Sequence, residues 1–245
     1  MPTAVLVHGG FHGGWCWKKV SDLLARDGWQ VYAPSLTGMG DRAHLLSRDI
    51  TFDTWAQDIA SLIETHDLRD FVLCGHSAAG CVITKVADQL HDRIRHLVYL
   101  DSQVLFDGET FFDSISDSTL GPPVFRELAA TGGDGWFIPA SALNAEAFGV
   151  TDPGDQAWVD ARLTPNPILP WEKAVNLSGN IEEVPRTYIR CEQWAFESFD
   201  RCITMAEADP AWHAERWDCA HDVMITDPEK VHNLLVRANS GYAGE

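Results

Sequence analysis

Residues 71 to 80 constrain the fold of this chain more than any other segment. They read Phe-Val-Leu-Cys-Gly-His-Ser-Ala-Ala-Gly, an apolar strand followed by small residues and then a helical pattern. A serine on a sharp strand-to-helix turn needs small residues two places before and two places after it, usually both glycine, so that the turn can close. Gly75 and Ala79 hold those places, and Gly80 follows. The pattern predicts a nucleophile at Ser77, with an ordinary turn of small residues as the alternative.

The rest of the chain repeats this change from strand to helix. Apolar runs of strand length alternate with helical patterns, which is typical of a parallel sheet covered by helices on both faces. We expect an α/β fold with a mainly parallel six-stranded sheet. The expected strands are residues 4–7, 30–33, 71–74, 96–100, 187–190 and 214–217, and the expected helices are 16–26, 54–66, 78–90, 199–208 and 228–238.

The alternation stops between about residues 103 and 183. This stretch is rich in turn residues, with Gly-Pro-Pro at 121–123, Thr-Asp-Pro-Gly at 151–154 and Pro-Asn-Pro at 165–167. About 80 residues are too many for one loop between two strands. We therefore expect a core made of residues 1–102 and 184–245, with residues 103–183 forming a small, mostly helical cap over the carboxyl edge of the sheet, where open α/β sheets bind ligands.

Composition excludes several classes of partner and cofactor. A formal net charge of -18 repels nucleic acid and anionic lipid surfaces. The sequence shows no membrane-length apolar run, and residues 1–7 lack the basic region of a signal peptide. Six cysteines without a C-x-x-C pair favour reduced thiols in the cytoplasm. His8 and His12 lie in a glycine-rich segment without a metal motif, so we expect neither a metal nor another cofactor.

Ser77 needs a base within hydrogen-bond reach, because a serine hydroxyl is a poor nucleophile at neutral pH. His221 is the candidate, since it follows the last expected strand and precedes a helix opened by Asp227-Pro228-Glu229. His76 adjoins the serine but is expected to point the wrong way for a base, so we assign it a structural role.

The reaction also needs donors for the oxyanion that forms on the attacked carbonyl. In a strand-to-helix turn of this kind, one donor is the backbone N–H after the nucleophile, here Ala78, and the other comes from a loop after an early strand. The loop at 8–11, His-Gly-Gly-Phe, follows the first expected strand. Its glycines let the backbone approach a substrate closely, although a glycine-rich turn without a ligand is the alternative.

Four segments together carry a resemblance to a known family. They are Val-His-Gly-Gly-Phe-His-Gly-Gly-Trp-Cys-Trp at 7–17, Thr-Gly-Met-Gly-Asp-Arg-Ala-His-Leu at 37–45, Gly-His-Ser at 75–77, and His221. The chain resembles the α/β-hydrolase branch that contains plant methylesterases, hydroxynitrile lyases and bacterial pyrethroid-hydrolase-like and carbendazim-hydrolase-like esterases. The resemblance covers nearly the whole chain outside the cap. It implies that His221 stands at the family's catalytic histidine and that the early oxyanion donor is the N–H of Gly10.

The resemblance also separates hydrolysis from its alternatives. Related lyases place threonine at the position of Gly9 and, directly after the catalytic histidine, a lysine that handles cyanide. This chain has Gly9 and Asp222 there. The resemblance therefore implies a serine hydrolase of carboxylic or carbamic esters, with a hydroxynitrile-lyase-type C–C lyase as the second alternative. A noncatalytic small-molecule receptor is the third, and the intact Ser77 and His221 speak against it.

A serine hydrolase usually has a third residue, an acid that orients the histidine. In this chain the position of that acid departs from the family pattern. Relatives usually carry an aspartate shortly after the strand expected at 187–190, but Trp194 stands about where that acid should be. Asp101, at the end of the strand expected at 96–100, is the first substitute, because some α/β-hydrolases supply the acid from that strand. Glu192 is the second, and a Ser–His dyad helped by water is the third, since losing the acid slows catalysis without abolishing it.

The expected substrate is a small, neutral ester. Ten Trp and 11 Phe imply an apolar pocket, although most of these side chains belong to the core. The candidates for substrate binding are Phe11, Trp136, Trp158 and Trp194. No cluster of basic residues marks the cap for an anionic acyl group. Small methyl esters, pyrethroid-type esters and heteroaromatic methyl carbamates such as carbendazim all fit the resemblance, while Cys16 and Cys219 are expected to pack the site without reacting.

Overall fold

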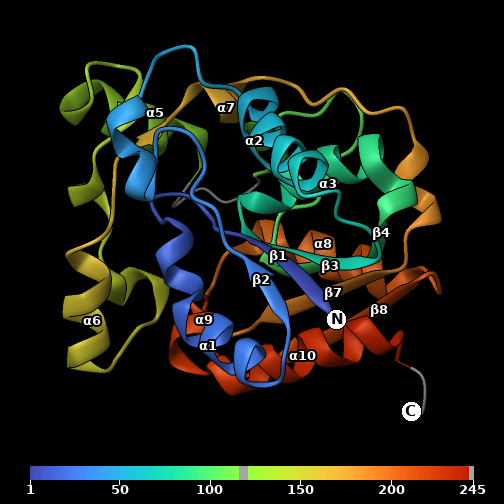
Figure 1. Cartoon of the computed structure of the whole chain (residues 1–245). Coiled ribbons are helices and arrows are strands. Elements are labelled where there is room, and N and C mark those ends of the chain that lie inside the picture. Colours follow the sequence, from blue (N-terminus) through green and yellow to red (C-terminus); the bar gives the residue numbers. More distant parts are fainter. Residues whose placement is uncertain (116–120, 243–245) are drawn as a thin grey trace.

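Six parallel strands form the centre of the computed structural model, which describes residues 1–115 and 121–242 (Figure 1). Residues 116–120 of the predicted cap and residues 243–245 lie outside the described residues. The strand order is β2-β1-β3-β4-β7-β8, and every neighbouring pair is parallel, which confirms the predicted sheet. The strands are β1 (Thr3–Val7), β2 (Gln30–Tyr32), β3 (Phe71–Ser77), β4 (Ile94–Ser102), β7 (Arg186–Cys191) and β8 (Trp212–Trp217).

Helices cover both faces of this sheet, and a separate apolar cluster fills each interface. One face carries α1 (Lys18–Arg26), α9 (Val223–Thr226) and α10 (Pro228–Ser240). The other face carries α2 (Phe52–Thr65), α3 (Ala79–Leu90) and α8 (Glu197–Ala208). The short 3-10 helices η1 (Gly14–Trp17), η2 (Gly40–Leu45) and η3 (His91–Arg93) lie in the connections.

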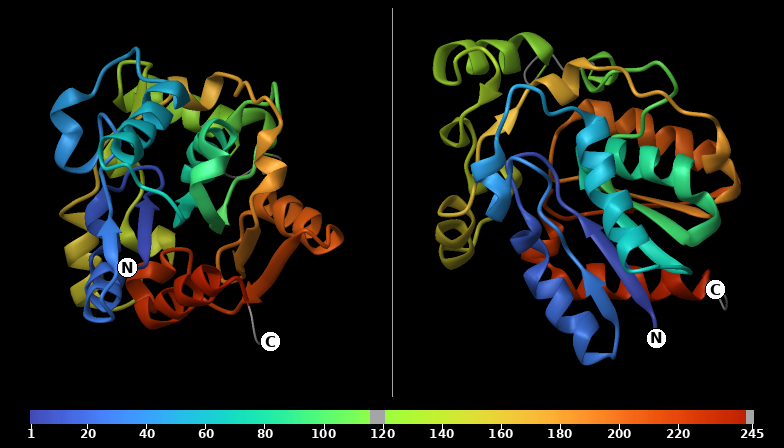
Figure 2. Two further views of the ribbon diagram at one scale, coloured as in Figure 1. Left: turned by 45° about the vertical axis from the view of Figure 1, so that its right-hand side comes forward. Right: turned by 45° about the horizontal axis from the view of Figure 1, so that its top comes forward.

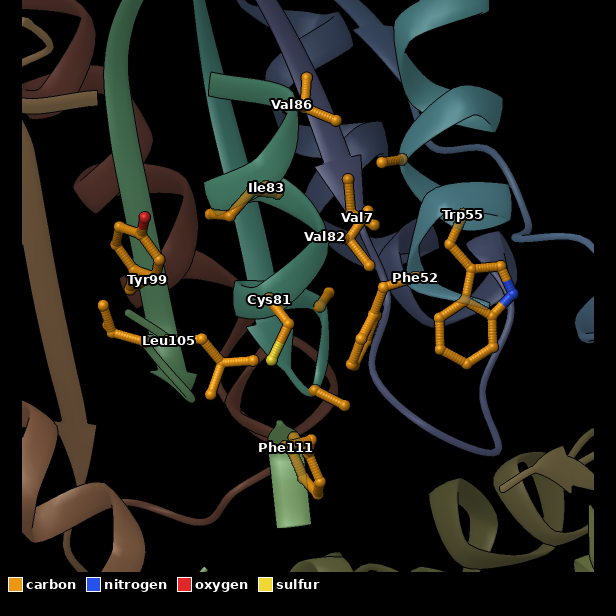
Figure 3. Packing of buried hydrophobic residues seen from close by; sticks show 14 of the residues in the cluster. Val7, Phe52, Trp55, Cys81, Val82, Ile83, Val86, Tyr99, Leu105 and Phe111 are labelled. Atoms are coloured by element: carbon orange, nitrogen blue, oxygen red, sulfur yellow. The ribbon is translucent and has the colours of Figure 1, made fainter. Parts of the chain in front are cut away.

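Helix α2 shows how local sequence determines these elements. Thr51 caps its first turn by accepting a hydrogen bond from the Thr54 N–H, and the Thr54 side chain bonds back to the Thr51 N–H. Buried residues recur every three or four positions, so they form one stripe along the helix. Figure 3 shows Phe52 and Trp55 from this stripe packed in one layer with Val82 and Val86 of α3.

The segment predicted to be a cap contains short elements instead of a regular layer. They are α4 (Phe111–Ser114), α5 (Pro122–Gly132), β5 (Phe137–Ile138), η4 (Ala140–Ala142), η5 (Ala145–Phe148), α6 (Pro153–Asp160), β6 (Asn166–Pro167), α7 (Leu169–Glu172) and η6 (Asn180–Glu183). Strands β5 and β6 form a two-stranded antiparallel sheet. Elements α5 to α7 lie at the end of the molecule toward which β1 runs (Figures 1 and 2). The boundaries of a separate cap at 103 and 183 stay a prediction.

Among the described residues, no helix is both long and apolar enough to cross a membrane.

Candidate active site

Ser77 ends β3 in a strained backbone conformation. Its φ is +56°, in the left-handed region that side chains other than glycine rarely adopt. The end of β4 holds this turn, because the Ser77 carbonyl accepts hydrogen bonds from Ser102 Oγ at 2.6 Å and from the Gln103 N–H at 3.2 Å. A Cβ at Gly80 would lie 2.0 Å from the Gln103 carbonyl oxygen. The close approach that requires glycine therefore falls at Gly80, which explains why Ala79 is tolerated at the usual glycine position.

Two other candidate residues share this backbone strain. Phe11 has φ +65° and Asp101 has φ +42°. Strained residues of this kind persist where the surrounding structure holds them, and they gather at functional sites. Phe11, Ser77 and Asp101 lie just after or at the carboxyl ends of β1, β3 and β4, three adjacent strands.

Asp101 lies against the candidate base. His221 Nδ1 is 2.6 Å from Asp101 Oδ2, and both side chains are buried, with exposed fractions of 1% and 0%. A carboxylate accepts hydrogen bonds, so the imidazole donates from Nδ1, and in its neutral form the free lone pair lies on Nε2. This is the tautomer that a general base needs.

Glu192, the second candidate for the acid, lies elsewhere. Its side chain is exposed and pairs with Arg216, with 3.6 Å between Glu192 Oε1 and Arg216 Nη1. The structure brings Asp101 and His221 together and directs Glu192 to the surface.

Aromatic side chains pack against the imidazole of His221, which is not part of the lining of the cavity that contains Ser77. The rings of Trp194, Phe199 and Phe148 lie 3.9, 5.9 and 6.2 Å from it, centre to centre, and all three residues line the cavity that contains Ser77. Among the described residues, no hydrogen bond joins Ser77 Oγ to His221. The candidate nucleophile and the candidate base therefore share these aromatic neighbours without a direct hydrogen bond in this structure.

His76 anchors the backbone of His221, the candidate base. Its Nε2 lies 3.0 Å from the His221 carbonyl oxygen, to which it donates, and the two rings are 4.3 Å apart. Burial, together with the neighbouring His221 and His12, lowers the pKa of His76 well below its ordinary value. It is neutral and bound to the backbone, as the sequence interpretation expected.

Both candidate oxyanion donors line the cavity. Gly10 and Ala78 lie beside Ser77, and within the described residues their N–H groups have no acceptor. The Phe11 peptide is fixed by β6 and the residues just before it: Asn166 Oδ1 accepts from the Phe11 N–H at 3.4 Å, and the Thr164 N–H donates to the Phe11 carbonyl at 2.8 Å.

A buried ion pair between His12 and Asp222 stabilises the loop that contains Gly10. His12 Nδ1 lies 2.8 Å from the Gly10 carbonyl oxygen, and His12 Nε2 lies 3.0 Å from Asp222 Oδ2. Burial opposes a charge on His12, but Asp222 and these hydrogen bonds raise its pKa above the ordinary value. Both partners are acceptors, so His12 carries two protons and links the residue after His221 to the Gly10 peptide. Burial meanwhile lowers the pKa of His8 to about 3.

One group of described side chains could in principle hold a metal. Candidate ligand atoms of His76, His221 and Asp222 lie within 4.8 Å of one another, and all three residues are buried. His76 Nε2 is bound to a carbonyl, His221 Nδ1 to Asp101 and Asp222 Oδ2 to His12. The group is organised as a hydrogen-bond network, and the absence of a cofactor stays a prediction.

The cavity beside Ser77 has a volume of ≈ 70 Å³ and no charged residue in its lining. Such an environment favours a neutral, apolar ligand group. The lining residues are Gly10, Phe11, Ser77, Ala78, Phe111, Phe125, Leu143, Ala147, Phe148, Trp171, Trp194, Phe196 and Phe199.

Two of the four predicted substrate-binding residues lie in this lining and two do not. Phe11 and Trp194 contribute to it. Trp136 packs against Phe137, with 4.8 Å between ring centres, and Trp158 packs edge-on against Trp15 at 5.0 Å. Neither residue lines the described cavity, because composition identifies aromatic residues in the predicted cap without showing which way they face; their part in substrate binding stays a prediction.

Sequence reasoning also missed most of the cavity wall. Phe196 and Phe199 follow Trp194 closely, and this aromatic spacing beside the expected position of the acid was the available signal. Phe111, Phe125 and Phe148 lie in short elements without clear periodicity, so no sequence signal assigned them.

The two cysteines near the site are buried thiols. Burial raises the pKa of Cys16 well above its ordinary value. Cys219 accepts a hydrogen bond from Cys191, which lowers the pKa of Cys219. All six cysteines are buried and free, while the cytoplasmic location inferred from their spacing stays a prediction.

Comparisons with known proteins identify the family and the fold of the chain. A model described as "Alpha/beta hydrolase family" matches residues 4–234. The chain is 35% identical to the carbendazim hydrolyzing esterase of Nocardioides sp. (strain SG-4G), covering 96% of this chain and 98% of that protein. It is 30% identical to the pheophorbidase of Raphanus sativus, covering 96% and 93%. Its backbone matches an extracellular alpha/beta-hydrolase from a Paenibacillus species with a TM-score of 0.82, at 22% identity over 97% of this chain and 99% of the other.

Proposed function

This chain belongs to the alpha/beta hydrolase family and is an ester hydrolase, and we propose that it cleaves neutral, hydrophobic or aromatic esters through an acyl-enzyme on Ser77. The observation that carries the proposal is the 2.6 Å contact between Asp101 and His221 behind the cavity that contains Ser77. A nucleophile, a base and an orienting acid in this relation make up the serine-hydrolase triad.

In the proposed reaction, Ser77 Oγ attacks the ester carbonyl while His221 Nε2 takes the hydroxyl proton. The Ser77–His221 hydrogen bond forms when substrate is bound, since such contacts are often long in unliganded enzymes. The oxyanion accepts hydrogen bonds from the N–H groups of Gly10 and Ala78. The carbonyl re-forms as the alkoxide leaves with the proton from His221, and water, deprotonated by His221, then hydrolyses the acyl-enzyme.

The cavity supports the choice of substrate. An uncharged lining favours neutral groups, and a volume of ≈ 70 Å³ is well below the ~300–1,000 Å³ of most ligand sites. We propose small esters, such as methyl esters, with any larger aromatic group extending out of the cavity. Methyl carbamates of the carbendazim type are included because the Nocardioides relative is named for hydrolysing carbendazim.

The loop at Gly9 supports hydrolysis over the lyase alternative. A Cβ at Gly9 would lie 2.7 Å from Ser77 Cβ, so the loop as folded has no room for the threonine of related lyases. Asp222, at the position of their lysine, is buried and paired with His12. Neither group required for a lyase is present at this site.

A fluorophosphonate probe and two substrates test the proposal. Wild-type protein should be labelled at Ser77, located by mass spectrometry, and should turn over both a short-chain p-nitrophenyl ester and a heteroaromatic methyl carbamate. Ser77→Ala should lose labelling and at least about 10³-fold in kcat, because the nucleophile is gone.

Ser61→Ala is the matched control, because Ser61 is exposed on α2 and does not line the cavity that contains Ser77. It should behave as wild type. Wild-type turnover by folded Ser77→Ala would overturn the mechanism, and turnover of the ester without the carbamate would restrict the substrate class to carboxylic esters.

A further inference from the structure

Arg190 is a buried charged residue within the strand that the sequence predicts at residues 187–190. It lies in β7 with an exposed fraction of 3%. A buried cation is costly unless it is paired and hydrogen-bonded. The partners of Arg190 therefore indicate what it stabilises.

The first partner is the proposed triad acid. Arg190 Nη1 lies 2.9 Å from Asp101 Oδ1, the oxygen that His221 does not use. The Cys191 N–H also donates to Oδ1 at 2.9 Å. Two donors on Oδ1 and one on Oδ2 together fix the orientation of the Asp101 carboxylate. Burial opposes the charge on Arg190, but Asp101 and Asp200 raise its pKa, so the guanidinium stays charged.

The second set of partners belongs to the loop after β7. Arg190 Nη1 donates to the Cys191 carbonyl at 2.6 Å, and Nη2 donates to the carbonyls of Trp194 at 3.0 Å and Phe196 at 3.4 Å. The indole of Trp194 stacks on His221 at 3.9 Å with an angle of 25° between the rings. The same guanidinium thus holds the acid on one edge of the imidazole and the aromatic residue on its face.

We propose that Arg190 is a positioning residue of the reaction: it orients Asp101 toward His221 Nδ1 and, through the loop of residues 191–196, holds Trp194 against the same ring. A planar guanidinium suits this role because its donors form a rigid fork. The inference rests on the proposed function of Asp101 and deepens it. It explains how a chain with Trp194 near the usual place of the acid supplies that acid from β4.

Asp200 provides the matched control. Its carboxylate accepts from Arg190 Nε at 2.8 Å but is 54% exposed and has no contact with Asp101 among the described residues. Asp200→Asn removes a salt bridge from the same guanidinium while leaving the Asp101 contact in place. Arg190→Met removes both, and Arg190→Lys keeps a charge within reach of Asp101.

The experiment measures kcat and KM for a short-chain p-nitrophenyl ester and records the downfield proton NMR signal of the short His221–Asp101 hydrogen bond. Arg190→Met should lose the signal and about 10²-fold in kcat, the upper end of the loss from removing an orienting partner, with KM changed less than threefold. Asp200→Asn should keep the signal and stay within threefold of wild type. Arg190→Lys should keep the signal and recover kcat to within tenfold of wild type.

Wild-type kcat and an intact signal in folded Arg190→Met would overturn the inference. If the methionine variant does not fold, the lysine variant decides, and a missing signal in folded Arg190→Lys would overturn it. Measuring Asp101→Asn in the same experiment distinguishes a failure of the proposed triad from a failure of the role proposed for Arg190. Wild-type kcat in that variant contradicts the proposed triad, whereas an impaired Asp101→Asn beside a normal Arg190→Met contradicts only the role of Arg190.

Discussion

At the scale of single residues, the site depends on positions where ordinary side chains are held in unusual backbone conformations. Phe11, Ser77 and Asp101 all have positive φ, and each belongs to a different strand end. Such conformations cost on the order of 1–3 kcal/mol each. Hydrogen bonds from the ends of β4 and β7 and from the β6 segment hold them in place.

Gly9 gives a residue-scale prediction. Gly9→Ala should lower both the melting temperature and kcat, because the new Cβ would lie 2.7 Å from Ser77 Cβ and 3.1 Å from the His76 carbonyl oxygen. Overpacking of this kind costs about 1–3 kcal/mol, or a few degrees in a chain of this size. Calorimetry and ester turnover measure the two effects.

Gly154→Ala is the comparison for that change. Gly154 lies exposed in the first turn of α6, where alanine favours the helix and its Cβ would meet only the end of the exposed Asp152 side chain, at 3.1 Å, so the melting temperature of Gly154→Ala should stay the same or rise slightly. A Gly9→Ala protein with wild-type stability and kcat would show that the loop yields easily, and would remove the steric argument against a lyase-type threonine.

At the scale of helices and strands, the sequence predicted the elements that are determined by a local residue pattern. All six strands and five main helices were placed correctly, because apolar runs and helical stripes are local signals. The strand ends were less accurate: β3 continues to Ser77 because Gly75 and His76 still pair with β4, although neither is an apolar strand residue. The β5–β6 pair joins Phe137 to Pro167 across a long stretch of chain, and no local pattern encodes such a pairing.

The residues of the candidate site also differ in how far the sequence could predict them. Ser77, the 8–11 loop and His221 could be predicted because each has a motif or a fixed place in the chain order. Asp101 could only be ranked against Glu192, since the choice depends on side-chain direction at two strand ends. Arg190 could not be predicted, because its role depends on contacts among β4, β7 and the loop that follows β7.

At the scale of the whole molecule, net charge and cavity act together on substrate choice. The chain has a formal net charge of -18, and no charged residue lines the cavity beside Ser77. The long-range field repels anions, and the cavity offers no counter-charge to bind them. Both effects favour neutral esters.

The dependence of kcat/KM on salt concentration distinguishes the long-range field from the effect of the cavity lining. For a neutral p-nitrophenyl ester, kcat/KM should be independent of salt between 0.01 and 1 M, about 30 to 3 Å in Debye length. For the same ester with a ring carboxylate, kcat/KM should be lower at low salt and rise severalfold as screening increases. A carboxylated ester that is preferred at low salt would show an unassigned cationic contact and contradict the neutral-substrate assignment.

Side-by-side kcat values for Asp101→Asn and Glu192→Gln test whether Asp101 orients His221 for attack by Ser77. Asp101→Asn should lower kcat by about 10³- to 10⁴-fold, because an asparagine in this position disfavours the tautomer with a free lone pair on His221 Nε2. Glu192→Gln, on the exposed partner of Arg216, should stay within about threefold of wild type. The reverse ranking, or equal activity of both folded variants, would contradict the account.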